Sequence, residues 1–145
     1  MADILKYTCN VSDVNCRYQE IHNEIFSLSV HKLVRNIVTD KSVSFKKHED
    51  ELKTLQGKLM NIQTTLDALP QSELNIRRGK EIFLTLSNYV TALTKSIDYL
   101  QKICHNKNTL SGSDSNLVNY KKGYDDAIQY HKNLGIRLNG LLSSF

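Results

Sequence analysis

The sequence predicts an all-α protein: an antiparallel (up-down) four-helix bundle with coiled-coil-like packing. Hydrophobic side chains recur at steps of three and four residues along most of the chain, which places them on one face of a helix. The 145 residues include one proline and six glycines, whereas an all-β protein needs a turn about every ten residues. With 40% hydrophobic and 23% charged residues, the composition is typical of a globular domain that has its own core.

The first helix is expected over residues 12–39, with Ser12 or Asp13 as its N-cap. Its apolar residues form two offset stripes, because the seam drifts around the helix near its middle, as a stutter produces. The first stripe contains Val14, Tyr18, Ile21, Ile25 and Leu28, and the second contains Phe26, Val30, Leu33 and Ile37. Residues 1–11 are expected to form a loose tail, so that 12–145 make up a single bundle domain. The alternative is that Ile4, Leu5 and Tyr7 dock on the bundle.

The second helix is expected over residues 43–69. An unbroken a/d heptad pattern runs through it, with steps that alternate between three and four residues. This pattern contains Phe45, His48, Leu52, Leu55, Leu59, Ile62, Leu66 and Leu69. Pro70 ends the helix, because proline donates no hydrogen bond and the residue before it avoids the α region.

The third and fourth helices are expected over residues 72–105 and 115–143. Both have a broad apolar stripe, which indicates contact with two neighbouring helices, as in a bundle. In the fourth helix, Gly123, Gly135 and Gly140 either weaken the helix by roughly 1 kcal/mol each or allow close approach of a neighbour. Short connections join the first three helices, so neighbours are expected to run antiparallel.

The net charge of +4 is mildly basic, and part of the positive charge is predicted to gather at one end of the bundle. That end collects the start of the second helix, the end of the third and the start of the fourth. The lysines concerned are Lys41, Lys46, Lys47, Lys102, Lys107, Lys121 and Lys122. Lysine near a helix N-terminus opposes the helix dipole, at a cost of up to ~1 kcal/mol, which suggests contact with an acidic partner.

An ordinary solvated helix surface is the alternative interpretation of these lysines. Four of them are followed, four residues later, by an acidic residue, and such pairs are common on exposed helix faces. The pairs are Lys46 with Asp50, Lys47 with Glu51, Lys121 with Asp125, and Lys122 with Asp126.

The sequence carries no pattern that predicts a catalytic, cofactor-binding or metal site. His48 and His131 occupy core-facing positions too far apart along the bundle to share a metal ion. They are expected at the edge of the core, bonded to water or a neighbour. Cys9 and Cys16 are seven residues apart, whereas structural zinc sites favour a shorter spacing, and Cys104 is expected as a small core residue. We therefore predict a protein that is not an enzyme and uses no cofactor.

The tyrosines divide into two groups. Four lie on or beside the apolar stripes and are expected at the edge of the core with their hydroxyls in water: Tyr18, Tyr89, Tyr120 and Tyr124. Tyr99 and Tyr130 fall off the main stripes. Exposed tyrosine is enriched where proteins meet, so these two are the better candidates for a partner surface.

These observations favour a non-enzymatic helical protein–protein interaction module, such as an adaptor, a complex subunit or a chaperone-like protein. The apolar stripes exceed what a four-helix core is expected to cover, and uncovered stripes usually mark interfaces with another protein or a second copy. The alternative is an accessory nucleic-acid- or phosphate-binding protein that uses the basic end, with binding that falls steeply with salt.

A cytoplasmic location is expected from the absence of targeting signals. No window approaches the ~20 apolar residues of a membrane span, and the N-terminus lacks the apolar stretch of a signal peptide. The three cysteines show no disulfide pattern, which fits a reducing compartment.

Overall fold

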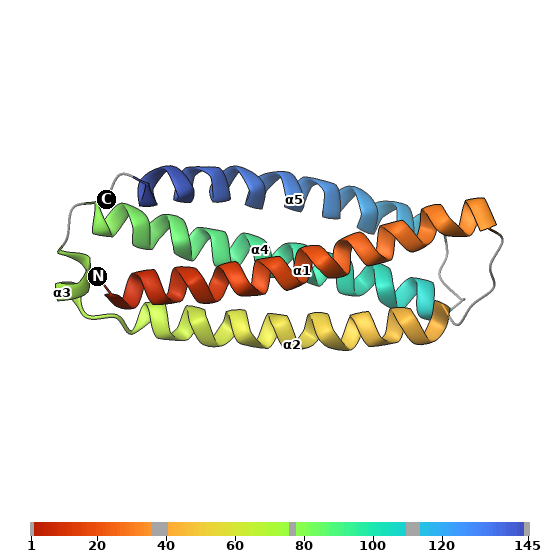
Figure 1. Cartoon of the computed structure of the whole chain (residues 1–145), viewed down its shortest axis with the longest axis horizontal. Coiled ribbons are helices and arrows are strands. Elements are labelled where there is room, and N and C mark those ends of the chain that lie inside the picture. The colour runs from red at the N-terminus through yellow and green to blue at the C-terminus, as the bar shows by residue number, and fades with distance from the viewer. Residues whose placement is uncertain (1, 36–40, 76–77, 110–113, 144–145) are drawn as a thin grey trace.

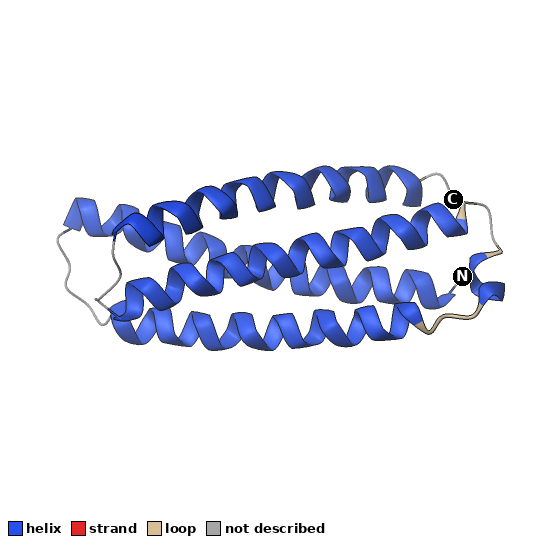
Figure 2. Cartoon of the chain, turned by 180° about the vertical axis from the view of Figure 1, so that it is seen from behind, coloured by secondary structure: helices blue, strands red, loops and turns tan. Residues whose placement is uncertain are grey.

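The computed structural model describes residues 2–35, 41–75, 78–109 and 114–143. Within these ranges the chain forms four long helices and one short helix, without strands (Figures 1 and 2). The helices are α1 (Ala2–Arg35), α2 (Lys41–Asp67), α3 (Gln71–Leu74), α4 (Gly79–Thr109) and α5 (Asp114–Leu142). The long helices lie side by side, and each runs antiparallel to the next long helix along the chain (Figure 1). The predicted all-α bundle is confirmed.

The periodic residues form the core. In α2 the whole seam from Phe45 to Leu66 is buried, and Leu69 is partly buried against it. Leu59 of α2 and Leu93 of α4 have no exposed surface at all. Full burial of a side chain of this size stabilises the folded state by roughly 1.5–3 kcal/mol, so these seams are the main source of cohesion between the helices.

The loose tail predicted for residues 1–11 is wrong, because α1 begins at Ala2. Ile4 is 1% exposed and Val11 2% exposed, and both join the core. Together with Val14 and Tyr18 they extend the first stripe at heptad spacing towards the N-terminus. Burial of these side chains against the other helices is what favours a helical N-terminus. The second predicted stripe, within residues 26–37, lies outside the residues whose side chains are described.

The third predicted helix, 72–105, is interrupted near its start. Pro70 has an extended backbone, as expected, but the turn of helix that follows it, α3, ends at Leu74. Arg78 has φ 60°, in the left-handed region that an α-helix cannot contain. The Ile82 amide then donates to the Arg78 carbonyl, and α4 runs from Gly79 to Thr109. The sequence does not predict this break, because residues 75–78 carry no proline to mark it.

The four long helices are not equally close to one another. The backbones of α2 and α5 each approach α4 along much of its length, whereas α1 approaches α2 less closely and α4 less still. Large side chains bridge the remaining distance between α1 and α5. In the bundle, α4 is therefore packed closely between α2 and α5, and α1 lies across this row of three helices.

Candidate functional site

A chain of hydrogen-bonded side chains joins α1 to α5. The hydroxyls of Tyr18 and Tyr124 lie 2.6 Å apart, and Nδ1 of His22 lies 2.6 Å from the same Tyr124 hydroxyl. Tyr18 and Tyr124 are both buried, so the expectation that their hydroxyls reach water is wrong. The reason is the spacing of the helices, because α1 and α5 stand far enough apart for two phenol rings to meet end to end between them.

His131 of α5 continues this polar cluster towards α4. Its Nδ1 is hydrogen-bonded to Oγ of Ser96 at 2.7 Å, and the rings of Tyr18 and Tyr89 stand edge-on to it at 5.8 and 6.0 Å. The side chain is only 2% exposed, deeper than the core edge predicted for it. Burial, with the positive charge of Lys132 as a smaller cause, lowers the pKa of His131 to about 4. The imidazole is therefore neutral near pH 7.

The remaining groups of the cluster are also held in their neutral forms. Burial raises the pKa of Tyr18 and of Tyr124 well above the usual range, and raises that of Tyr89 to about 12. Burial and Lys132 lower the pKa of His22. A pocket of about 180 Å³ opens beside the cluster, between Gln19 of α1 and Ile128 of α5. Since the polar atoms mainly bond one another, the cluster is suited to fixing how α1 sits on α5.

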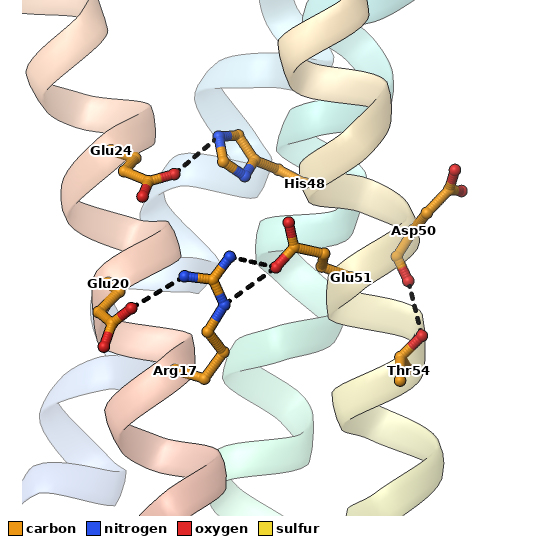
Figure 3. A network of polar contacts seen from close by, with 7 residues as sticks. All are labelled: Arg17, Glu20, Glu24, His48, Asp50, Glu51 and Thr54. Carbon is orange, nitrogen blue, oxygen red and sulfur yellow. Dashed lines mark hydrogen bonds and ion pairs between the residues drawn. The ribbon is translucent and has the colours of Figure 1, made fainter.

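A second polar network fastens the opposite flank of α1 to α2 (Figure 3). The Arg17 guanidinium donates to Glu51 from Nε at 2.9 Å and from a second nitrogen, and it donates to Glu20 at 2.9 Å. These two carboxylates raise the pKa of Arg17. Nε2 of the buried His48 lies 3.3 Å from a Glu24 oxygen. As predicted, each of the two histidines contacts a neighbour, His48 with Glu24 of α1 and His131 with Ser96 of α4.

The predicted basic end is assembled, since the start of α2, the end of α4 and the start of α5 meet at one end of the bundle (Figure 1). Part of its charge is compensated there. Lys46 is paired with Asp50 at 3.3 Å, and Lys102 with Asp98 at 3.1 Å. The Lys102 ammonium also lies 5.6 Å from the centre of the Tyr99 ring. The Asp98 carboxylate is the main cause that raises the pKa of Lys102.

The other lysines of this group differ from one another. Lys47, Lys121 and Lys122 are exposed, and within the described part of the chain they form no ion pair. For Lys47 the reason is visible, because Arg17 takes the carboxylate of Glu51, its predicted partner. The side chains of Lys41 and Lys107 lie outside the described residues. Whether any of these lysines contacts an acidic partner stays a prediction.

The two tyrosines that fall off the stripes line one groove, which we call the α4–α5 groove. It encloses about 400 Å³ and is lined by Asn88, Thr91, Ala92, Lys95, Tyr99, Gly123, Asp126, Ala127 and Tyr130. Ala92 and Ala127 keep its floor low. Tyr130 is 58% exposed at the rim. The sequence singled out Tyr99 and Tyr130 separately, but only the pairing of α4 with α5 shows that they belong to one surface.

Gly123 determines how Tyr99 sits in this groove. A Cβ at Gly123 would stand 2.6 Å from Cε1 of Tyr99, so the ring lies directly on the α5 backbone. A Cβ at Gly135 would likewise meet the Tyr89 ring at 3.1 Å, whereas one at Gly140 would meet nothing within 4 Å. Of the two roles left open for these glycines, close approach thus applies to the first two.

Opposite charges stand on the two walls of the groove. Lys95 projects from α4 and Asp126 from α5, and both line the groove without being buried. Among the described residues neither forms an ion pair, with the other or elsewhere. The groove therefore combines aromatic rings, small apolar residues and two uncompensated charges of opposite sign.

Among the residues whose side chains are described, the large exposed hydrophobic residues are spread over four helices. They are Leu5 of α1, Met60 of α2, Leu84 of α4, and Tyr130 and Ile136 of α5. A further groove of about 380 Å³ runs between α1 and α2, with Val14, Leu55 and Ile62 among its lining residues. In the described part of the chain, no helix combines the length and apolarity needed to cross a membrane, and no three metal-binding side chains gather at one point.

Comparison of the chain with protein-family models, with curated protein sequences and with solved structures finds no match.

Proposed function

We propose that this chain is a non-enzymatic helical protein–protein interaction module, an adaptor or complex subunit, which contacts its partner through the α4–α5 groove. The observation that carries the proposal is the joint placement of Tyr99 and Tyr130 over a floor of small residues. Tyrosine supplies a large contact area together with a hydroxyl, and it is enriched where proteins meet. A low floor admits a partner side chain close to the backbone of α4 and α5.

The charges on the groove walls support a protein partner. Lys95 and Asp126 have no ion-pair partner among the described residues, so each is available to a group of opposite charge on another molecule. Charges of both signs on opposite walls favour one orientation of the partner over its reverse, because the reverse places like charges together.

The polar contacts on both flanks of α1 fit a scaffold for such a surface. The tyrosine–histidine cluster on one flank and the Arg17 network on the other hold α1 across the row of α2, α4 and α5. Buried polar groups of this kind favour one packing arrangement when they bond one another. Cys9, Cys16 and Cys104 form no disulfide with one another, which fits the reducing cytoplasm that we propose as its location.

A matched pair of threonine variants tests this function. Thr91 lines the groove and donates its hydroxyl to the carbonyl four residues before it, and Thr64 of α2 makes the same bond away from the groove. Both are exposed, so Thr91→Arg and Thr64→Arg introduce the same side chain into equivalent helical surfaces. In affinity purification from the native host, we expect Thr91→Arg alone to lose a protein that the wild type retains. Equal retention by both variants would exclude the groove as the contact surface.

Nucleic-acid or phosphate binding at the basic end is the alternative function. The exposed Lys47, Lys121 and Lys122 favour it, because no carboxylate among the described residues pairs with them. Acidic residues interleaved with these lysines weaken the local positive charge. An electrophoretic shift assay at low and high salt decides the question. Binding that disappears with salt, and that is lost when Lys46, Lys47, Lys121 and Lys122 are neutralised together, would establish this function instead.

A further inference from the structure

We propose that the occupant of the α4–α5 groove is a second copy of this chain, so that the protein forms a symmetric dimer through this face. The inference rests on the proposed function, because it names the partner of the same groove. It is carried by the charges on the walls, Lys95 on α4 and Asp126 on α5, which are complementary to each other but are not paired within the described chain.

A two-fold axis that runs along the groove makes these charges meet. A half-turn about this axis places α4 of one copy over α5 of the other, because the two helices run side by side on either wall. This rotation keeps each residue at its level along the groove. Tyr99, one turn after Lys95, lies on Gly123, one turn before Asp126, so in these antiparallel helices Lys95 and Asp126 are near the same level on opposite walls. The rotation therefore brings each Lys95 to the Asp126 of the other copy. The contact occurs twice, as in every isologous interface.

A symmetry axis across the helices gives the opposite result. That rotation places α4 over α4 and α5 over α5, and with the axis at the level of Lys95 and Asp126 each lysine faces a lysine and each aspartate an aspartate. Like charges repel, so the wall charges select the axis along the groove. In the selected arrangement the exposed Tyr130 on α5 of each copy comes to lie over the α4 wall of the other, where Thr91 leaves room for a ring.

Charge reversal tests the dimer through Lys95→Glu and Asp126→Lys. Each variant alone replaces two attractive contacts by two repulsive ones. We expect the dissociation constant measured by sedimentation velocity to rise about tenfold or more for either.

A mixture of the two variants is decisive, because every contact in the mixed dimer joins opposite charges. In one contact the new carboxylate at position 95 meets the new ammonium at position 126, and in the other the native Asp126 meets the native Lys95. We therefore expect the mixture to regain the wild-type affinity. Thr64→Arg is the control that leaves dimerisation unchanged.

The results separate the dimer from the wider function. A wild type that stays monomeric at every concentration, or a mixture that stays as weak as its components, overturns the second copy as occupant. If Thr91→Arg still loses a different protein in that case, the groove remains the interface and only its occupant was wrongly assigned. A wild-type dimer that Thr91→Arg, Lys95→Glu and Asp126→Lys all leave intact overturns the groove as the dimer interface. If Thr91→Arg also retains every protein that the wild type retains, the groove is overturned as a contact surface altogether.

Discussion

Protonation of His131 is expected to destabilise the fold in mildly acidic solution. Its pKa is about 4 in the folded protein, against the ordinary value of 6.5, because burial disfavours the charged imidazole. A histidine whose pKa is lowered by folding favours the folded state only while it is neutral. Its contribution is therefore complete above the unfolded pKa, falls as the pH drops below 6.5, and levels off below about 4.

The two pKa values determine how large this effect is. The full difference between 6.5 and about 4 corresponds to about 3 kcal/mol, since one pKa unit is worth about 1.4 kcal/mol. Between about pH 7 and about pH 5 the loss is about 2 kcal/mol, because the unfolded chain is then almost fully protonated and the folded chain hardly at all. The pKa of His22 is also lowered, so its titration adds to the loss in the same direction.

Urea denaturation followed by circular dichroism isolates the part that is due to His131. The free energy of unfolding is measured for the wild type and for His131→Gln at both pH values. The variant itself costs some stability at neutral pH, because it disturbs the contact with Ser96. We expect the wild type to lose about 2 kcal/mol more than the variant on acidification. Equal losses in both proteins would refute the argument, because the imidazole would then be free to take up its proton in the folded state.

Three further predictions concern other contacts. Gly123→Ala is expected to lower the free energy of unfolding by about 1 kcal/mol, because the new Cβ displaces the Tyr99 ring. At Gly57 a Cβ meets nothing within 4 Å, so Gly57→Ala is expected to raise the free energy of unfolding by up to about 1 kcal/mol through helix propensity. Thermal denaturation of the two variants compares them, and a Gly123→Ala protein as stable as Gly57→Ala would show that the ring moves aside freely. Tyr124→Phe removes the hydroxyl that joins α1 to α5, and we expect it to lower the free energy of unfolding in urea by about 1–3 kcal/mol. An unchanged free energy of unfolding would mean that the tyrosine–histidine cluster does not hold α1 on α5. In the same measurement, Arg17→Met is expected to lower the free energy of unfolding by up to about 1 kcal/mol at low salt and by less at high salt, because the ion pairs of Arg17 are partly exposed. A decrease that does not depend on salt would contradict their electrostatic origin.

Much of the architecture was predictable because helical periodicity is a local property of the chain. The α2 seam was identified residue by residue from its steps of three and four, and each of its positions up to Leu66 is buried. Helix ends were less predictable. The N-terminal extension of α1 depends on the burial of Ile4 and Val11 against other helices, and the break before α4 depends on a left-handed Arg78. Neither helix end is marked in the sequence by a residue such as Pro70, which marks the end of α2.

The candidate groove was predictable only in fragments. Tyr99 and Tyr130 stood out because they leave the apolar stripes, and Gly123 because it interrupts a helix. Nothing in their spacing showed that the three belong together, since they come from two helices and meet only when those helices pair. The lysines of the basic end illustrate the same limit. Their gathering at one end followed from the up-down topology, but the capture of Glu51 by Arg17 did not.

By itself the sequence determined the class of fold, the identity of the long helices and most of the core. The reason is that apolar side chains at every third or fourth position lie on one face of a helix, and that face is buried against the other helices. The tertiary structure decided how far each helix stands from its neighbours. That distance brings Tyr18 against Tyr124, isolates His131 from water and opens the groove between α4 and α5. Such spacing results from packing many side chains on several helices at once, and no segment of the chain encodes it alone.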